Sequence, residues 1–322
     1  QALRKALPAA RHDEAIAFTR AFYQRMTEDE FPVHPPEAWA ALAADLLDFA
    51  RKRKPGTANV RVFNAVARKH GWESPHTVLQ VVNDDMPFLV DSVTMALADL
   101  GLGVHVLGHP VVAFKRDRAG KLIGVGEGDG ESLIHLEFDR QPAEAMPRIE
   151  EAIRRVLEDV RAIVTDWAAM RERMLEVADD LGTRQLPMSA SGRDEAQAFL
   201  RWASDDHFTF LGYRHYKVRK RGKDEVLVAD EDTGLGLLRG KDPGKPRNLK
   251  TLAAHYMPHS GSVDALILTK TNARATVHRP GYMDYIGVLA FDDAGNPVAE
   301  ERFLGLYTSS AYNRRPWDIP LV

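Results

Sequence analysis

Acidic side chains offer the most direct starting point for chemistry in this sequence. Asp84 and Asp85 are adjacent, and Asp91 follows further along the chain. Carboxylates gathered in this way can act as a general acid and a general base. An Asp between a strand and a helix more often caps the helix, because its carboxylate accepts hydrogen bonds from the first N–H groups. We therefore interpret the pair as helix-capping residues and keep acid–base catalysis as the alternative.

Histidines could bind a metal ion if the fold gathered them. His105 and His109 would lie near His135 if their strands are neighbours. His255 and His259 are four residues apart, but a proline between them interrupts any helix that would align them. No carboxylate completes either set, and the chain has no Cys, so thiolate ligands are excluded. We predict no metal site.

Glycine-rich segments fail the tests for nucleotide-binding loops. Residues 124–130 do not align with G-x-G-x-x-G, and they precede a strand where a dinucleotide fingerprint must open a helix. Residues 236–241 are one position short of a P-loop, and Asp242 replaces the required hydroxyl. No Ser lies in a G-x-S-x-G nucleophile elbow. We therefore predict no catalytic residue and no cofactor in this segment.

Composition limits the classes of partner. The 322 residues include 43 Lys and Arg against 46 Asp and Glu, a net charge of −3. This balance disfavours nucleic acid and anionic membranes as partners. No apolar run approaches the roughly 18 residues that span a bilayer. The chain begins at Gln1 without an initiator Met or a signal peptide, so we expect a trimmed or internal piece with a cytoplasmic location. Its length suggests about two domains.

The first 70 residues carry helical periodicity. Trp39, Leu42, Leu46 and Phe49 form one apolar stripe on a helix that ends at residues 51–54, four consecutive basic residues. We interpret this run as a solvated helix end, which complements the helix dipole. A second helix is predicted over 60–69 and ends at His70-Gly71.

From residue 77 the pattern becomes a mixture of strands and helices. Strands are predicted over 77–82, 104–114 and 132–138, with a helix after Pro87 and a hairpin turn at 117–120. This β-α-β-β order begins a ferredoxin-like split βαβ unit.

A long heptad stripe follows this unit. Its apolar residues alternate spacings of four and three and predict a helix about 50 Å long. We expect the N-terminal helices to pack along it, with a second subunit as the alternative. The stripe comprises Ile149, Ile153, Val156, Val160, Ile163, Trp167, Met170, Met174, Val177 and Leu181.

The last third of the chain is rich in predicted strands. Residues 182–193 have linker composition, and a short helix is predicted over 194–204. A second short helix is expected near 249–254, and the basic run from Arg214 to Lys223 is interpreted as a solvated edge strand. The predicted strands cover residues 207–218, 226–229, 265–270, 285–291 and 302–308.

Residues 85–91 and 98–102 resemble the strand-turn-helix of an ACT domain, the amino-acid-sensing module. The resemblance implies that the turn binds a small effector through Asn83, Asp84, Asp85, Met86 and Phe88. Family members usually have Gly, which lets a ligand approach the backbone, where this chain has Phe88. That difference favours an alternative in which the unit is structural.

Nearly the whole chain resembles the N-terminal region of the large bacterial NAD-specific glutamate dehydrogenases. The similarity is clearest in residues 131–138, 208–214, 234–239 and 301–309. It implies an α+β chain with an ACT-like βαββα unit and long helices, followed by a small antiparallel PAS-like domain. We divide the chain into a helical region, 1–72, an ACT-like domain with the heptad helix, 73–181, a linker, 182–204, and the PAS-like domain, 205–322.

Three hypotheses for function follow. The first is a non-catalytic regulatory and assembly segment of an enzyme that oxidises L-glutamate with NAD, with the catalytic residues and the NAD site in a C-terminal part of the same protein. Its expected partners are that catalytic part, a small amino-acid effector and further copies in a homo-oligomer. The second is a purely structural oligomerisation module without a ligand. The third is a free-standing hydrolase that uses Asp84, Asp85 or His135.

Overall fold

The computed structural model describes residues 11–24, 34–183, 188–249, 265–313, 315 and 319–320. The chain divides into two compact units, residues 1–158 and 159–322. The division lies within one long helix, α6, Met146–Thr183. The boundaries expected from the sequence, after residues 72, 181 and 204, therefore differ from the observed one. The apolar stripe of α6 continues through both units, so composition does not change where they meet.

The first unit contains a mixed arrangement of helices and antiparallel strands. Its sheet has the order β1-β2-β6-β4-β5, and β3 also pairs with β6. Every pairing in it is antiparallel. The strands are β1 (Asn59–Asn64), β2 (Thr77–Asp84), β3 (Val104–Gly108), β4 (Val111–Arg116), β5 (Leu122–Val125) and β6 (Asp129–Phe138). The helices that precede α6 are α2 (His12–Tyr23), α3 (Pro36–Ala50), α4 (Ala67–His70) and α5 (Leu89–Asp99).

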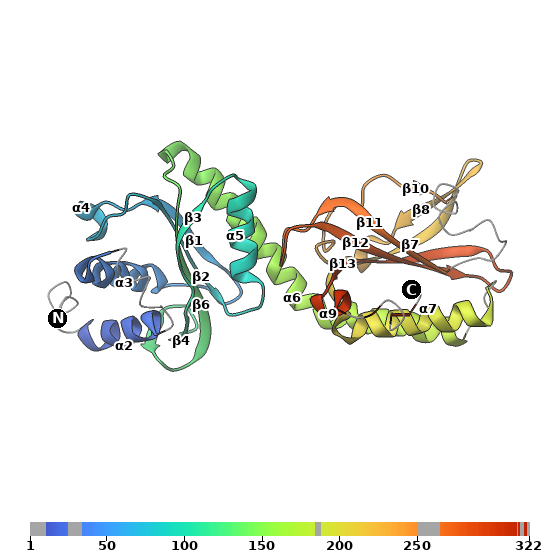
Figure 1. Cartoon of the computed structure of the whole chain (residues 1–322), viewed down its shortest axis with the longest axis horizontal. Coiled ribbons are helices and arrows are strands. Elements are labelled where there is room, and N and C mark those ends of the chain that lie inside the picture. Colours follow the sequence, from blue (N-terminus) through green and yellow to red (C-terminus); the bar gives the residue numbers. More distant parts are fainter. Residues whose placement is uncertain are drawn as a thin grey trace. The chain divides into compact units, whose positions relative to one another are not determined.

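Helices cover both faces of this sheet, which explains why its central strands, β2 and β6, are buried on both faces. One core contains Phe18 of α2 and Leu42 of α3 packed with Val78 and Val82 of β2. The alternate residues of β2, such as Leu79, are equally buried toward the opposite face. Figure 1 shows α2 and α3 on one face of the first sheet and α5 with the first part of α6 on the other.

The predicted strand-helix-strand unit is present, with β6 inserted between its two strands. The chain runs from β2 through α5 to β3 and β4. β6 pairs antiparallel with β2 along one edge and with β3 and β4 along the other. The single strand predicted over 104–114 is broken at His109-Pro110, because a proline cannot donate a ladder hydrogen bond. The predicted turn at 117–120 is confirmed by a hydrogen bond from Gly120 N–H to the Asp117 carbonyl, 2.9 Å.

The helix predicted over 60–69 was wrong. Residues 59–64 form the edge strand β1, paired with β2, and only α4 is helical. Val60 and Val62 alternate with half-buried neighbours, the period-two pattern of a strand with one buried face. The predicted cap is confirmed, because Gly71 adopts a left-handed φ of 77° after α4.

The predicted heptad helix is confirmed as α6, but its partners differ from those expected. Its apolar residues are buried except for Trp167, which is 42% exposed. Arg154 donates to the Val60 carbonyl of β1 at 2.8 Å, so the first part of α6 lies over the sheet. The N-terminal helices pack on the opposite face of that sheet rather than along α6. The sheet itself supplies the apolar surface that the stripe needs.

The second unit is built on another antiparallel sheet. Its order is β10-β8-β7-β13-β12-β11, with β9 beside β7. The predicted strands of this region are confirmed, and the helix expected near 249–254 lies almost wholly outside the described residues. The strands are β7 (Phe208–Arg221), β8 (Asp224–Ala229), β9 (Leu235–Gly236), β10 (Arg247–Asn248), β11 (Leu266–Arg274), β12 (Tyr282–Phe291) and β13 (Pro297–Tyr307).

Helices α7 (Ala190–Trp202) and α9 (Ser309–Tyr312) accompany the second part of α6 in this unit. Gln197 of α7 donates to the Ala178 carbonyl of α6 at 2.9 Å, and Arg173 of α6 forms an ion pair with Glu301 of β13 at 2.5 Å. These contacts place α6 and α7 on one face of the second sheet, as Figure 1 shows. Residues on the opposite face of that sheet line a cavity.

Candidate functional site

The turn between β2 and α5 contains the five residues predicted to bind an effector. Phe88 precedes α5 with a left-handed φ of 70°, a conformation that favours glycine. Its carbonyl accepts hydrogen bonds from the N–H and the hydroxyl of Ser92, at 3.0 and 2.6 Å. The residue that replaces the family's usual Gly therefore occupies a backbone conformation that Gly adopts without strain. Such strain concentrates at functional turns.

A buried ion-pair network supports this turn from below. Arg53 is 3% exposed and pairs with Asp84 at 2.7 Å and with Glu131 at 2.8 Å. Arg116 also contacts Glu131, at 2.5 Å. Burial alone would lower the pKa of Arg53, but the hydrogen bonds to both carboxylates outweigh it and raise that pKa. Burial would raise the pKa of Glu131, and the two guanidinium groups instead hold it below its ordinary value. Arg53 thus differs from the solvated helix end expected from the basic run.

The five predicted residues differ in their solvent exposure. Asn83 is 1% exposed, and Asp84 is occupied by Arg53 and by the N–H of Gly56, 3.1 Å away. Asp85 is exposed, whereas Met86 and Phe88 are half-buried. The turn therefore presents Asp85, Met86 and Phe88, and it holds Asn83 and Asp84 inside. The N-cap of α5 is Phe88 rather than Asp84 or Asp85, and no side-chain hydrogen bond caps the helix at that position.

The candidate metal ligands are dispersed. His105 lies beside Asp139 at 2.8 Å and stacks on His76, while His109 contacts Ser132. His135 is buried elsewhere, and His255 and His259 lie outside the described residues. Within the described ranges no group of three His, Cys, Asp or Glu could hold a metal ion. None of the helices described is long and apolar enough to cross a membrane.

A second buried polar cluster of the first unit was not predicted. Glu137 of β6 contacts His34 at 2.6 Å and His135 at 3.3 Å, and Ser74 also donates to it. Burial would raise the pKa of Glu137, but hydrogen bonds from the two histidines and Ser74 hold that pKa well below its ordinary value. Gln80 completes the cluster through His135 at 3.2 Å. All these groups are enclosed, so we assign them a structural role in joining residue 34 to the sheet.

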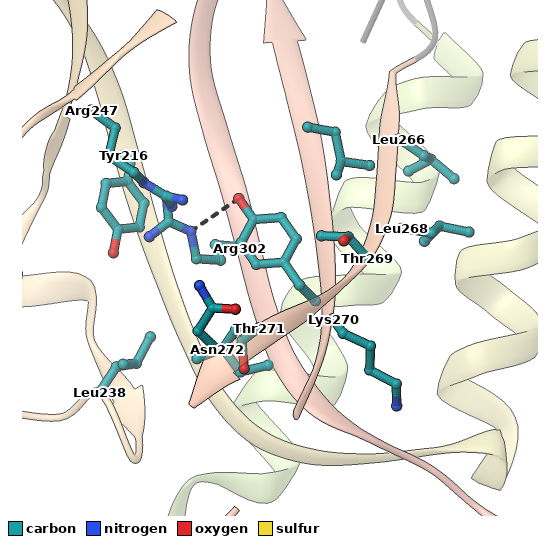
Figure 2. Close-up of a pocket in the computed structure, with 13 residues that line it drawn as sticks. Tyr216, Leu238, Arg247, Leu266, Leu268, Thr269, Lys270, Thr271, Asn272 and Arg302 are labelled. Carbon is teal, nitrogen blue, oxygen red and sulfur yellow. Dashed lines mark hydrogen bonds between the residues drawn. The ribbon is translucent and has the colours of Figure 1, made fainter. Parts of the chain in front are cut away.

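The second unit contains a cavity of about 650 Å³ on the face of its sheet opposite α6 and α7. Figure 2 shows Tyr216, Arg247 and Arg302 grouped together, with Thr271 and Asn272 of β11 beside them and Lys270 extending away. The lining residues come from β7, β10, β11, β12 and β13 and from one preceding turn. They are Tyr216, Leu238, Arg247, Leu266, Ile267, Leu268, Thr269, Lys270, Thr271, Asn272, Tyr285, Arg302 and Leu304.

A fixed cluster of charged and aromatic groups forms one wall of this cavity. The guanidinium of Arg302 lies 3.6 Å from the ring centre of Tyr216 and donates to the Tyr285 hydroxyl at 3.2 Å, the dashed line of Figure 2. Arg302 also donates to Glu300 at 2.8 Å, and Tyr285 donates to the same carboxylate. Glu300 is fully buried. Four side chains thus hold one another in a single geometry.

This wall was missed at the sequence level for an identifiable reason. Residues 300–302 are three consecutive charged residues, a composition typical of solvent-exposed positions, whereas all three are buried in β13. Glu301 faces the helices and pairs with Arg173, while Glu300 and Arg302 face the cavity. Residues two positions apart lie on the same face of a strand, so the acidic Glu300 and the basic Arg302 can pair there. That spacing of opposite charges is the sequence signal that could have indicated this wall.

Comparison with known proteins adds the family context. Residues 18–153 match the family described as glutamate dehydrogenase, ACT1 domain. An NAD-specific glutamate dehydrogenase from Halomonas elongata is 33% identical over 96% of this chain, and one from Pseudomonas aeruginosa is 36% identical over 82%. One from Mycobacterium tuberculosis is 28% identical over 76%. These matches cover 20%, 17% and 14% of the relatives, so the chain spans about a fifth or less of their length.

Proposed function

Because residues 18–153 carry a glutamate dehydrogenase ACT1 domain and the chain is related to NAD-specific glutamate dehydrogenases over most of its length, we propose that it is a regulatory and assembly segment of such an enzyme. In this proposal the chain contains no catalytic residue and no cofactor, and NAD binds elsewhere in the whole protein. The parent enzyme converts L-glutamate to 2-oxoglutarate and ammonia. A cytoplasmic location and a homo-oligomeric parent belong to the same proposal.

One observation carries this proposal: nearly the whole chain aligns with enzymes of which it spans only about a fifth. A dehydrogenase needs a dinucleotide-binding fold, whose phosphate-binding turn opens a helix after a parallel strand. Every strand pairing in the described sheets is antiparallel. The small share of the relatives that this chain spans, together with its antiparallel sheets, supports a role other than hydride transfer.

Strand order supports the finer fold assignment within this proposal. In the first sheet β6 separates β2 from β4, and β1 lies on the outer side of β2. That is the order of a ferredoxin-like sheet in which the outer strand precedes the βαβ unit instead of following α6. In the second sheet the first long strand, β7, lies between β8 and the last, β13. We retain the PAS-like interpretation for this unit.

We further propose that a small amino acid binds at the turn between β2 and α5. The N-terminus of α5 offers N–H groups and a positive partial charge to a carboxylate. Exposed Asp85 is available to a ligand's ammonium group, with Met86 and Phe88 flanking it. Binding would act by favouring one domain arrangement, with a coupling free energy of about 1–3 kcal/mol.

Calorimetric titration of the 322-residue chain with a panel of amino acids tests the effector proposal. We expect one or more amino acids to release heat and raise the melting temperature. Asp85→Asn should weaken that binding by about tenfold, since a charge-assisted contact is lost. Asp99→Asn, an exposed acid at the other end of α5, is the matched control and should leave binding unchanged. Absence of heat with every amino acid would contradict an effector at this turn.

A purely structural module remains the second candidate function, and two observations favour it. The charges beneath the turn are already paired within the chain, and the bulky Phe88 occupies the position where a ligand would approach the backbone. An assay for NAD reduction with L-glutamate should give no turnover under either candidate. Measurable turnover by the 322-residue chain would contradict both.

A further inference from the structure

The cavity of the second unit carries an excess of positive charge, and the proposed function assigns it no role. Its lining includes Arg247, Lys270 and Arg302, and among the described residues that line it none is acidic. Arg302 is neutralised by Glu300, and Lys270 by Asp284 at 2.6 Å. Arg247 is exposed and forms no ion pair with any described residue. The cavity therefore retains one positive charge at its edge.

A second, buried cation lies beside Arg302 on the same face of the sheet. Arg214 of β7 is 1% exposed and is the register partner of Arg302. It donates to the carbonyl of Lys241 at 2.7 Å and to that of Leu238, and no described carboxylate pairs with it. Its Nε is buried without a hydrogen-bond partner. Carbonyl dipoles offset a buried charge only in part, so this guanidinium adds to the positive potential of the site.

The walls are already ordered for a ligand with an organic body. The ring of Tyr216 is fixed beneath Arg302, and the ring of Tyr285 is fixed by its hydroxyl contacts. Arg247 lies 5.9 Å from the ring centre of Tyr285. Ordered side chains lower the entropic cost of binding, because fewer rotamers are lost when a ligand arrives. Thr269, Thr271 and Asn272 add neutral polar groups from the neighbouring strand.

The cavity also joins two distant edges of the sheet. β10 and β11 are the two ends of the strand order, yet residues of both line the same space. No ladder hydrogen bonds connect these two strands among the described pairings. An occupant that touched Arg247 of β10 and Thr269 of β11 would therefore bridge two strands that no described ladder hydrogen bond joins.

We propose that this cavity binds a small organic anion, whose carboxylate or phosphate group pairs with Arg247 while its body lies against Tyr216 and Tyr285. A guanidinium suits either oxyanion, because its parallel N–H groups match two oxygens at once. A free inorganic ion would leave most of a 650 Å³ space unfilled. A metal cation would meet a positive lining in which no described residue supplies a carboxylate ligand.

Titration calorimetry on the 322-residue chain at low ionic strength tests this proposal. Citrate represents a carboxylate ligand, AMP a phosphate ligand with an organic body, and inorganic phosphate the oxyanion alone. We expect citrate or AMP to bind, and either result supports the proposal while identifying the preferred oxyanion. Binding should weaken as salt is added, because the contact at Arg247 is screened.

Arg247→Gln should weaken the binding of citrate or AMP at least about tenfold, the loss of one charge-assisted contact. Arg221→Gln is the matched control, since it removes the same charge from an exposed position of β7 outside the cavity lining. Circular dichroism spectra of both variants should match that of the unmodified chain, because both side chains are exposed.

Three results would overturn the proposal. One is the absence of binding by citrate and AMP at millimolar concentration. Another is an equal loss of affinity in Arg221→Gln and Arg247→Gln, which would indicate general attraction to the surface. The third is binding of inorganic phosphate as tight as that of AMP, which would show that the aromatic walls do not contact the ligand.

Discussion

The two units handle buried charge in opposite ways. Beneath the β2–α5 turn, Arg53 is held by Asp84 and Glu131, and Arg116 also contacts Glu131, so cations and anions balance. Around the cavity of the second unit, Glu300 pairs with Arg302 and Asp284 with Lys270, whereas Arg214 and Arg247 pair with no described carboxylate. The first arrangement is complete without a ligand, whereas the second keeps excess positive charge beside an open space.

This difference in charge predicts that the two units bind ligands of different net charge. A balanced turn with one exposed acid, Asp85, is compatible with a zwitterion such as an amino acid, which brings no net charge. A positive cavity with aromatic walls suits an organic anion. The comparison therefore predicts that net charge of the ligand decides which unit responds.

Breaking the balanced network should have the largest effect. Arg53→Gln would leave Glu131, whose side chain is 3% exposed, with one guanidinium and no water to replace the lost partner. Removing one member of a buried ion pair costs about 3–5 kcal/mol. Urea denaturation of the 322-residue chain should show that loss. Lys54→Gln, an exposed neighbour, should change the free energy of unfolding little, and a similar loss in both would contradict the assigned role of Arg53.

Acid should destabilise the second unit through Glu301. Burial would raise its pKa, but hydrogen bonds from His215, Arg173 and Tyr213 lower it to about 2, from an ordinary value of 4.5. Protonation therefore favours the unfolded chain, and stability present above pH 4.5 is lost as the pH falls toward 2. The shift corresponds to roughly 3 kcal/mol.

Denaturation curves between pH 6 and pH 2 check this expectation. Glu301→Gln should flatten the pH dependence of stability in that window relative to the unmodified chain. Glu225→Gln, an exposed acid of β8, should retain it. If the two variants show the same pH dependence, the ion pair with Arg173 does not contribute as described.

The smallest expected effect concerns the backbone of the turn. Phe88→Gly and Phe88→Ala both delete the ring, but only Gly adopts a φ of 70° without strain. The Gly variant should therefore be more stable than the Ala variant by about 1 kcal/mol. Urea denaturation of the two variants side by side isolates this term. Equal stabilities would mean that the turn relaxes when the ring is removed.

Much of the fold could be predicted because its signals are local. The heptad stripe of α6 and the alternation in β6 are complete within one segment of sequence. The strand β1 was missed because Val60 and Val62 form a short pattern that a helix also accommodates, and its pairing with β2 depends on residues thirteen or more positions away. The partners of α6 were missed for the same reason, since a stripe does not specify what covers it.

The site could be predicted less well because burial of charge is a tertiary property. Arg53 and Arg214 each lie in a basic run typical of solvated surfaces, yet both are buried. The cavity is formed by strands that are distant in the sequence, so no local motif marks Arg247 or Tyr216 as neighbours of Arg302. The ACT-like turn, by contrast, is contiguous and was placed correctly between β2 and α5.

Hydrogen exchange of the 322-residue chain, measured with and without a saturating concentration of whichever of citrate and AMP binds more tightly, tests the division between the two units most directly. We expect this anion to slow backbone exchange in β10, β11 and β12, which border the cavity, and to leave the turn at residues 83–92 unchanged. Protection confined to residues 83–92, or no protection anywhere in the chain, would contradict the account.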